Sequence, residues 1–249
     1  MAACFRAALA TLALMASMPC VMPAFAQSPD PGTDQPPPSS GGAAYKPPLR
    51  GAPGGRVGGA SRGAIKSAVS LPTIELVAPL DHTGETTSAT PILYFFVSQP
   101  VTLPTQFTIA APLRPAPVLE ANFPSPPARG LYALRLADYH VQLDPGIVYT
   151  WSVAAIVDPA HWARNVVASA TILRVPPDAG AEAALGTASP LRRAALLAGA
   201  GLWYDAVAAA AEAENLDHHA ALDELLTEVG LTGPAGADRA ARIAPPALR

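Results

Sequence analysis

The apolar and polar positions from Leu71 to about Pro177 follow the pattern of a β-protein. Short apolar runs alternate with Pro, Gly and Asp, and no stretch between them has the length and period of a helix. Such runs between turn-forming residues predict strands. We predict strands at Thr73–Ala78, Pro91–Val97, Gln106–Ala110, Leu131–Leu136, Val148–Val157 and Val166–Val175, and residues 111–130 leave room for a seventh. Strands in succession without helices between them predict an antiparallel sandwich.

The clearest local pattern follows Pro145 and Gly146, a dipeptide that favours a tight turn. The next strand alternates between two faces, with Tyr149, Trp151 and Val153 on one and Thr150 and Ser152 on the other. The sequence Leu-x-Pro-Gly-x-x-Tyr, ending at Tyr149, is also that of the tyrosine corner, and in this it resembles fibronectin type III and related sandwiches. We therefore predict a fibronectin- or immunoglobulin-like antiparallel β-sandwich with Tyr149 and Trp151 as structural residues.

After Pro177 the strand pattern stops, and Ala, Leu and Glu become frequent, which favours helix. Ser189 before Pro190 is a typical helix start, because Ser caps the first free amides and Pro fits the first turn. The predicted helices run from Ser189 to about Ala198, from Leu202 to Glu214 and from Asp217 to Gly230. We expect consecutive short helices of this kind to form an antiparallel hairpin, with Trp203 in the core.

The chain therefore divides into a mostly β part and a small α part. The β-sandwich spans 71–177, the helical segment spans 178–231, and the tail at 232–249 contains three Pro residues and is expected to be loose. The pattern leaves open whether the helices pack on the sandwich.

The first residues have the layout of a secretory signal peptide. Arg6 precedes an apolar run over Ala7–Met18, and Ala24-Phe25-Ala26 is a small-residue cleavage site. The apolar run is too short for a membrane span of about 20 residues. We expect cleavage after Ala26, so residues 1–26 are a signal peptide and the mature protein is periplasmic or secreted.

Cleavage at this site removes both cysteines, Cys4 and Cys20. The mature chain then has neither a disulfide nor a thiolate nucleophile. A lipid anchor on Cys20 is the weaker alternative, because the residues before it fit a lipoprotein signal poorly. No later segment has 18 continuous apolar residues, so we expect no transmembrane segment after cleavage.

Residues 27–70 have the composition of a linker, with 8 Pro, 9 Gly and 6 Ser. Such a stretch buries too little apolar surface to offset the entropy lost on ordering, so we expect it to be disordered. Its second half is basic and contains no acid, with Lys46, Arg50, Arg56, Arg62 and Lys66. It is either a solvated tether or an arm that contacts an acidic polymer, an anionic head group or its own domain.

The composition excludes several classes of protein. Of 249 residues, 50% are hydrophobic and 14% are charged, which is too apolar for a fully disordered chain and too poor in charge for a coiled coil. The formal net charge is -3, so no overall basic field exists to hold nucleic acid. We expect no nucleic-acid partner.

Three parts of the sequence are informative when they are taken together: Tyr45–Gly59, Ala78–Thr87, and Tyr149–Ser152 together with Gly201–Ala206. Their order and spacing resemble one bacterial family, the domain of unknown function family 928. The resemblance extends from about Tyr45 to Leu231. Its members are exported proteins that are frequent in cyanobacteria and also occur in other Gram-negative bacteria. The resemblance implies a secreted or periplasmic module, and it implies no activity, cofactor or catalytic residue.

The loop after the first predicted strand is one candidate site. It contains Asp81, His82, Thr83 and Gly84, and an Asp beside a His can serve acid–base chemistry. However, adjacent side chains on an extended chain point apart, and no nucleophile motif occurs. We expect this loop mainly to structure a turn, with His82 and Thr83 as the alternative ligand contacts.

The loop between the last two strands is a second candidate. It carries His161, Trp162 and Arg164 after Asp158-Pro159, and these side chains suit sugars, peptides or anions. A turn started by Asp158-Pro159 is the simpler interpretation. We name His161, Trp162 and Arg164 as candidate binding residues.

Potential metal ligands occur at the start of the third helix. Glu214 is spaced i, i+4 from His218, and His219 is spaced likewise from Asp223. The two pairs lie on neighbouring faces and lack the His-Glu-x-x-His order. We expect a solvated helix start, no metal and no cofactor.

The sequence thus favours an exported, non-enzymatic module that binds another protein of the cell envelope. A carbohydrate or surface-polymer binder is the alternative, with the loop from His161 to Arg164 as the contact. A hydrolase is the distant third, because a set of nucleophile, base and metal is missing.

Overall fold

The fold is described from a computed structural model of the chain. It describes residues 44–48, 54–58, 71–178, 184–212, 216–231 and 241–243, and the side chains of 216–219 are not included. The expected signal peptide at 1–26 lies outside these ranges, as does most of the expected linker. Within the described ranges, no helix is long and apolar enough to cross a bilayer.

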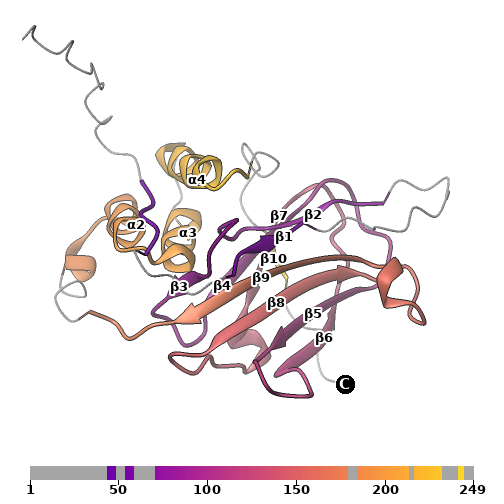
Figure 1. Cartoon of the computed structure of the whole chain (residues 1–249). Helices are drawn as coiled ribbons and strands as arrows, with labels where there is room; N and C mark the ends of the chain where they lie inside the picture. The colour runs from indigo at the N-terminus through magenta and orange to yellow at the C-terminus, as the bar shows by residue number, and fades with distance from the viewer. Residues whose placement is uncertain are drawn as a thin grey trace, which may run out of the picture. The chain divides into compact units, whose positions relative to one another are not determined.

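Two sheets form an open β-sandwich (Figure 1). The smaller sheet has the order β10-β7-β4-β2, with β10 at Ala241–Ile243, β7 at Gly130–Arg135, β4 at Ile92–Val97 and β2 at Ile74–Leu76. The larger sheet has the order β9-β8-β5-β6, with β9 at Val166–Arg174, β8 at Val148–Ala155, β5 at Thr105–Ala110 and β6 at Leu119–Phe123. Its β9 edge is extended by β1 (Arg56–Val57) and β3 (Gly84–Thr86), which both pair with β9.

All six predicted strands are present, and β6 is the seventh, within 111–130. Their alternation explains the two-layer packing. In β5, Phe107 and Ile109 are fully buried, whereas Gln106 and Thr108 are partly exposed on the other face. The prediction of a mostly β, sandwich-type fold is therefore confirmed.

The tyrosine corner is also present. The Tyr149 side chain is only 3% exposed, and its hydroxyl accepts a hydrogen bond from the Asp144 amide at 3.1 Å. Gly146 in the preceding turn has φ of +78°, a conformation that favours glycine. The turn and the buried hydroxyl together fix the entry of β8 into the larger sheet.

The helical segment contains α2 (Pro190–Gly199), α3 (Trp203–Glu212) and α4 (Leu216–Glu228). These agree with the predicted helices to within a few residues. The side chain of Ser189 accepts a hydrogen bond from the Arg192 amide, as a helix cap does. Gly201, with φ of +80°, makes the sharp connection between α2 and α3.

Helix α3 joins the core of the sandwich. Trp203 is fully buried and donates its ring N–H to the Val77 carbonyl oxygen at 3.1 Å. The next residue, Tyr204, accepts a hydrogen bond from the Trp151 ring N–H and donates to the Thr171 carbonyl oxygen, both at 2.9 Å. The helices therefore pack on the sandwich and share one hydrophobic core with it.

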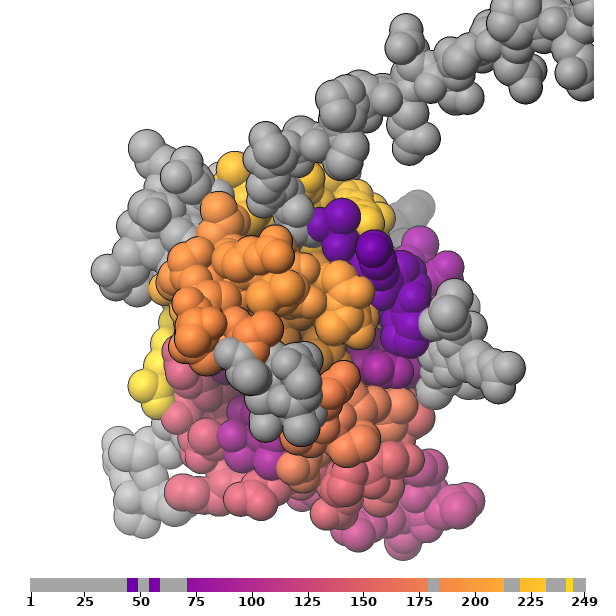
Figure 2. All heavy atoms as spheres, turned by 90° about the vertical axis from the view of Figure 1, so that its left-hand side faces the viewer, coloured from indigo at the N-terminus to yellow at the C-terminus, as the bar shows by residue number. Residues whose placement is uncertain are grey.

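Two stretches of the expected linker also dock on the domain, as the indigo atoms beside the helices show (Figure 2). Tyr45 is 4% exposed, and its ring packs edge to face against Trp203, with 4.9 Å between the two ring centroids. The amide of Lys46 donates to the Ala198 carbonyl oxygen, and that of Arg56 donates to the Leu80 carbonyl oxygen. For residues 44–48 and 54–58, which we call the arm, the solvated-tether expectation does not hold. Among the alternatives given for the basic half of the linker, contact with its own domain is the one that fits these residues.

The tail differs from expectation at one place. Ala241–Ile243 forms β10, which runs parallel to β7, and Ile243 is buried. Arg242 forms an ion pair with Asp138. Composition does not reveal such a short strand, because its pairing with β7 and its side-chain contacts involve residues that are far away in the sequence. The rest of the tail expected at 232–249 lies outside the described residues.

Candidate functional site

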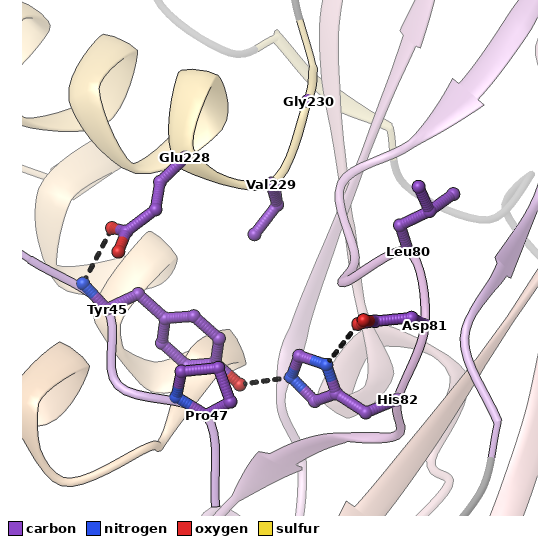
Figure 3. Close-up of a pocket in the computed structure, with 8 residues that line it drawn as sticks. All are labelled: Tyr45, Pro47, Leu80, Asp81, His82, Glu228, Val229 and Gly230. Atoms are coloured by element: carbon purple, nitrogen blue, oxygen red, sulfur yellow. Dashed lines mark hydrogen bonds and ion pairs between the residues drawn. The ribbon is translucent and has the colours of Figure 1, made fainter.

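The arm closes over a pocket of about 420 Å³ (Figure 3). The hydroxyl of Tyr45 lies 2.8 Å from His82 Nε2, and His82 Nδ1 lies 2.8 Å from an Asp81 carboxylate oxygen. With the proton on Nδ1, His82 donates to Asp81 and accepts from Tyr45. The expectation that Asp81 and His82 point apart is wrong, because the chain bends at Leu80 and Asp81 instead of continuing as an extended strand.

The pKa values of this group follow from burial and from the neighbouring carboxylates and imidazole. Burial raises the pKa of the Tyr45 hydroxyl above its usual value, and the carboxylates of Glu85 and Asp81 raise it further. The hydrogen bond from His82 lowers the pKa of the Asp81 carboxyl. The hydroxyl therefore stays protonated, and both ring nitrogens of His82 already have partners.

The same pocket ties the arm to α4. The Tyr45 amide donates to a Glu228 carboxylate oxygen at 2.7 Å, and Arg56 donates to the Val229 carbonyl oxygen at 3.3 Å. The polar groups of Tyr45 and His82 thus bind one another, Asp81 or α4. We interpret this pocket as the clasp that holds the arm.

Thr83 lies in the interior. It is 0% exposed, and its hydroxyl shares a hydrogen bond of 2.9 Å with that of Thr171. Further along the loop, Asp205 in the first turn of α3 accepts hydrogen bonds from the hydroxyl of Thr86 and from the amide and hydroxyl of Thr87. This loop therefore ties β3 to α3.

The loop between β8 and β9 keeps Trp162 at the surface. Asp158 accepts hydrogen bonds from His161 Nδ1 at 2.8 Å and from an Arg164 guanidinium nitrogen at 2.9 Å. The hydrogen bond from His161, and secondarily that from Arg164, lowers the pKa of the Asp158 carboxyl. Of the three candidates in this loop, His161 and Arg164 brace Asp158, whereas the side chain of Trp162 is 53% exposed.

Trp162 lies at the end of a groove of about 760 Å³ on the outer face of the larger sheet. Strands β5, β6 and β8 form the floor, and they lie side by side in Figure 1. The register places Thr108 between Glu120 on β6 and Ser152 on β8. The lining residues are Pro104, Gln106, Thr108, Ala110, Arg114, Pro115, Pro117, Glu120, Asn122, Ser152, Ile156, Pro159, Trp162 and Asn165.

Polar side chains on this floor remain open to a ligand. Within the described part of the chain, the side chains of Thr108, Asn122 and Ser152 have no recorded hydrogen-bond partner, and all three are at least partly exposed. Gln106 and Glu120 are linked at 3.2 Å on the exposed surface. The floor thus offers hydroxyls, a carboxamide and a carboxylate on small, short side chains.

Asn165 joins the groove to the Trp162 loop. Its side-chain oxygen, Oδ1, accepts hydrogen bonds from the backbone amides of Val157 and Asp158, each at 2.9 Å. These two bonds fix the orientation of the carboxamide. The residue is 4% exposed, and its Nδ2 has no acceptor among the described residues. An oriented donor without an acceptor is uncommon in a folded protein and marks this end of the groove.

The potential metal ligands of the third helix are only partly described. Asp223 is described, whereas Glu214 and the side chains of His218 and His219 lie outside the described part. The prediction of a solvated helix start therefore remains a prediction.

Sequence reasoning missed two arrangements. The outward positions of β5 and β8 carry a polar pattern in the sequence, but the pattern does not say that β6 lies beside β5. The pairing of Tyr45 with His82 gives no local signal, because these residues are far apart in the chain.

Comparison with known proteins gives one match. The sequence matches the Domain of Unknown Function (DUF928) family over residues 57–238, well over half of the chain. No curated protein and no solved structure matches it. The matched range includes strands β2 to β9, the helices and the residues that join them, such as Trp151 and Tyr204. The chain therefore belongs to the Domain of Unknown Function family DUF928.

Proposed function

We propose that this protein is an exported, non-enzymatic interaction module of a bacterial cell envelope, periplasmic or secreted. Export is supported by the signal-peptide pattern of residues 1–26. Family membership supplies no activity, so the proposal rests on the surface of the protein itself.

The observation that carries the proposal is the groove on the outer face of β5, β6 and β8. Its volume lies within the range of about 300–1,000 Å³ that ligand clefts commonly have. It combines an exposed Trp162 with open polar groups on a rigid sheet. Exposed aromatic side chains beside a row of hydrogen-bonding groups are typical of binding surfaces.

The other polar cluster supports a function without catalysis. In the clasp, the His82 ring is held between Asp81 and the protonated hydroxyl of buried Tyr45. A general base must be within reach of a substrate proton, and the hydroxyl that His82 faces belongs to Tyr45, which is only 4% exposed. A hydrolase would need this group to open and a nucleophile to lie beside it.

For an exported module, an envelope protein is the first class of partner to consider. Such a partner can add a strand at β6, which pairs only with β5 among the described strands and borders the groove. A glycan is the second class of partner, and it would occupy the groove itself.

The proposal is tested by photo-crosslinking in intact cells. A benzoylphenylalanine replaces Thr108 on the groove floor, and the control places it at Thr227, which is exposed on α4. We expect a defined protein or glycan adduct from position 108 that is absent from position 227 and is lost when Trp162→Ala is added. Equal adducts from both positions, or none from position 108, would contradict the proposal.

A further inference from the structure

We propose that the groove on β5, β6 and β8 binds an extended, uncharged oligosaccharide segment. This inference rests on the proposed function, because it names the ligand class of the same groove. The argument uses the aromatic end of the groove, the polar floor, the balance of charge and the oriented donor at Asn165.

The aromatic end supplies a stacking surface. Trp162 is 53% exposed in a short 3-10 turn, η2 (Trp162–Arg164), and the turn is braced through Asp158. The flat C–H face of a pyranose packs well on an indole ring, because it is apolar while the rim of the sugar is polar. The other two tryptophans, Trp151 and Trp203, are fully buried and cannot serve this role.

The floor supplies hydrogen-bonding side chains that are spaced as the neighbouring strands of the sheet are. Neighbouring strands lie about 4.8 Å apart, so the row Glu120, Thr108 and Ser152 spans about 10 Å across three strands. Gln106 and Asn122 form the next row on β5 and β6. Short hydroxyl and amide side chains both donate and accept, as sugar hydroxyls do.

The charges favour an uncharged ligand. Among the lining residues, Arg114 and Glu120 are the only ones with a formal charge, and their charges are opposite. The basic side chain within the Trp162 turn, Arg164, forms an ion pair with Asp158. A phosphate or uronate polymer would need a cluster of Arg or Lys here, and the lining contains no such cluster.

Asn165 gives an independent indication of a ligand. Its carboxamide is held by two backbone amides, and its Nδ2 lacks an acceptor among the described residues. Asn165 lines the groove, so a ligand oxygen that reached this nitrogen would satisfy it. A sugar hydroxyl or ring oxygen has the required chemistry.

The test is calorimetric titration of the full mature chain with uncharged hexasaccharides. The probes are cellohexaose, maltohexaose and chitohexaose, and hexagalacturonate serves as the anionic comparison. We expect at least one uncharged probe to bind more tightly than the anionic one. Trp162→Ala should weaken binding about tenfold or more, and Asn122→Ala should weaken it several-fold. Leu113→Ala, a change at a more exposed apolar residue outside the lining, should leave affinity within about twofold.

The outcomes separate this inference from the proposed function. Absence of binding by all three uncharged probes, preference for hexagalacturonate, or unchanged affinity in Trp162→Ala would overturn the inference. If position 108 still gave a protein adduct in cells, the interaction module would stand with a different ligand class. If neither adduct nor glycan binding occurred, both proposals would fall. Thermal melts of each variant check that it is folded.

Discussion

At the scale of single residues, buried aromatic side chains with polar tips join separate parts of the molecule. Tyr204 is the clearest case, because its hydroxyl accepts from Trp151 on β8 and donates to the Thr171 carbonyl on β9. Burial raises the pKa of this hydroxyl, so it remains a donor across the physiological range. One side chain thus connects a helix to two strands.

Replacing Tyr204 by Phe should lower the free energy of unfolding by about 1–3 kcal/mol, because a buried donor and a buried acceptor lose their partner. The matched control is Tyr139→Phe. The Tyr139 hydroxyl is buried and has no partner among the described residues, and its ring also contacts Phe107. This change should stay within about 0.5 kcal/mol. Urea unfolding measures both, and equal effects would contradict the role given to Tyr204.

Tyr149→Phe tests the tyrosine corner in the same way. Loss of the hydroxyl leaves the Asp144 amide without its partner, so the free energy of unfolding should fall by about 1–3 kcal/mol. An unchanged denaturant midpoint would show that the corner contributes nothing to stability.

At the scale of elements, the sequence predicted what periodicity and turn chemistry encode. The long strands and α2 to α4 were predicted within a few residues, and Ser189 was correctly assigned as a cap. The short strands β1, β3 and β10 were not, because two or three residues carry no period and are held by backbone pairing with distant strands. Docking of the arm on its own domain was only one of the alternatives that the sequence left open, because Tyr45 lies far along the chain from Trp203 and His82, which it contacts.

The turn that presents Trp162 should depend on ionised Asp158. The hydrogen bond from His161 lowers the pKa of this carboxyl below its usual value. A carboxyl whose pKa is lower in the folded protein than in the unfolded chain stabilises the folded turn at any pH above its unfolded-state pKa. This stabilisation is lost as the pH falls through the folded-state pKa. Acrylamide quenching of Trp162, taken as the difference from Trp162→Phe, should therefore stay constant from about pH 8 to 5 and rise at lower pH.

Asp158→Ala should show the higher quenching already at pH 7. Near-ultraviolet circular dichroism of buried Trp151 and Trp203 serves as the check that the core is intact. Quenching that is the same in the variant and the parent chain at pH 7 would mean that Asp158 does not hold the turn.

At the scale of the whole molecule, the helices are part of the sandwich rather than a separate hairpin hung beside it. Trp203 and Tyr204 belong to the same hydrophobic core as the two sheets, and Tyr45 of the arm packs edge to face against Trp203. The sequence left this packing open, because hydrophobic periodicity shows that a helix has an apolar face but not what the face meets. The groove was hidden for a related reason, since it depends on the order of β6, β5 and β8.

A chain ending at Pro177 should therefore fail to unfold cooperatively. It lacks the side chains that bind Trp151 and the Val77 carbonyl, and it exposes the apolar surface that α3 covers. Thermal melting followed by circular dichroism, together with binding of a hydrophobic dye, measures this. A sharp transition at the temperature of the full chain would contradict a shared core.

The central claim is that the groove beside Trp162 is the binding surface, and the fluorescence of that residue tests it most directly. Trp162 is the one exposed tryptophan of three, so acrylamide quenching reports on it almost alone. We predict that adding the best-bound uncharged hexasaccharide lowers quenching of the full chain and leaves Trp162→Phe unchanged. Quenching that does not respond to any of the hexasaccharides, or that responds equally in Trp162→Phe, would contradict the claim.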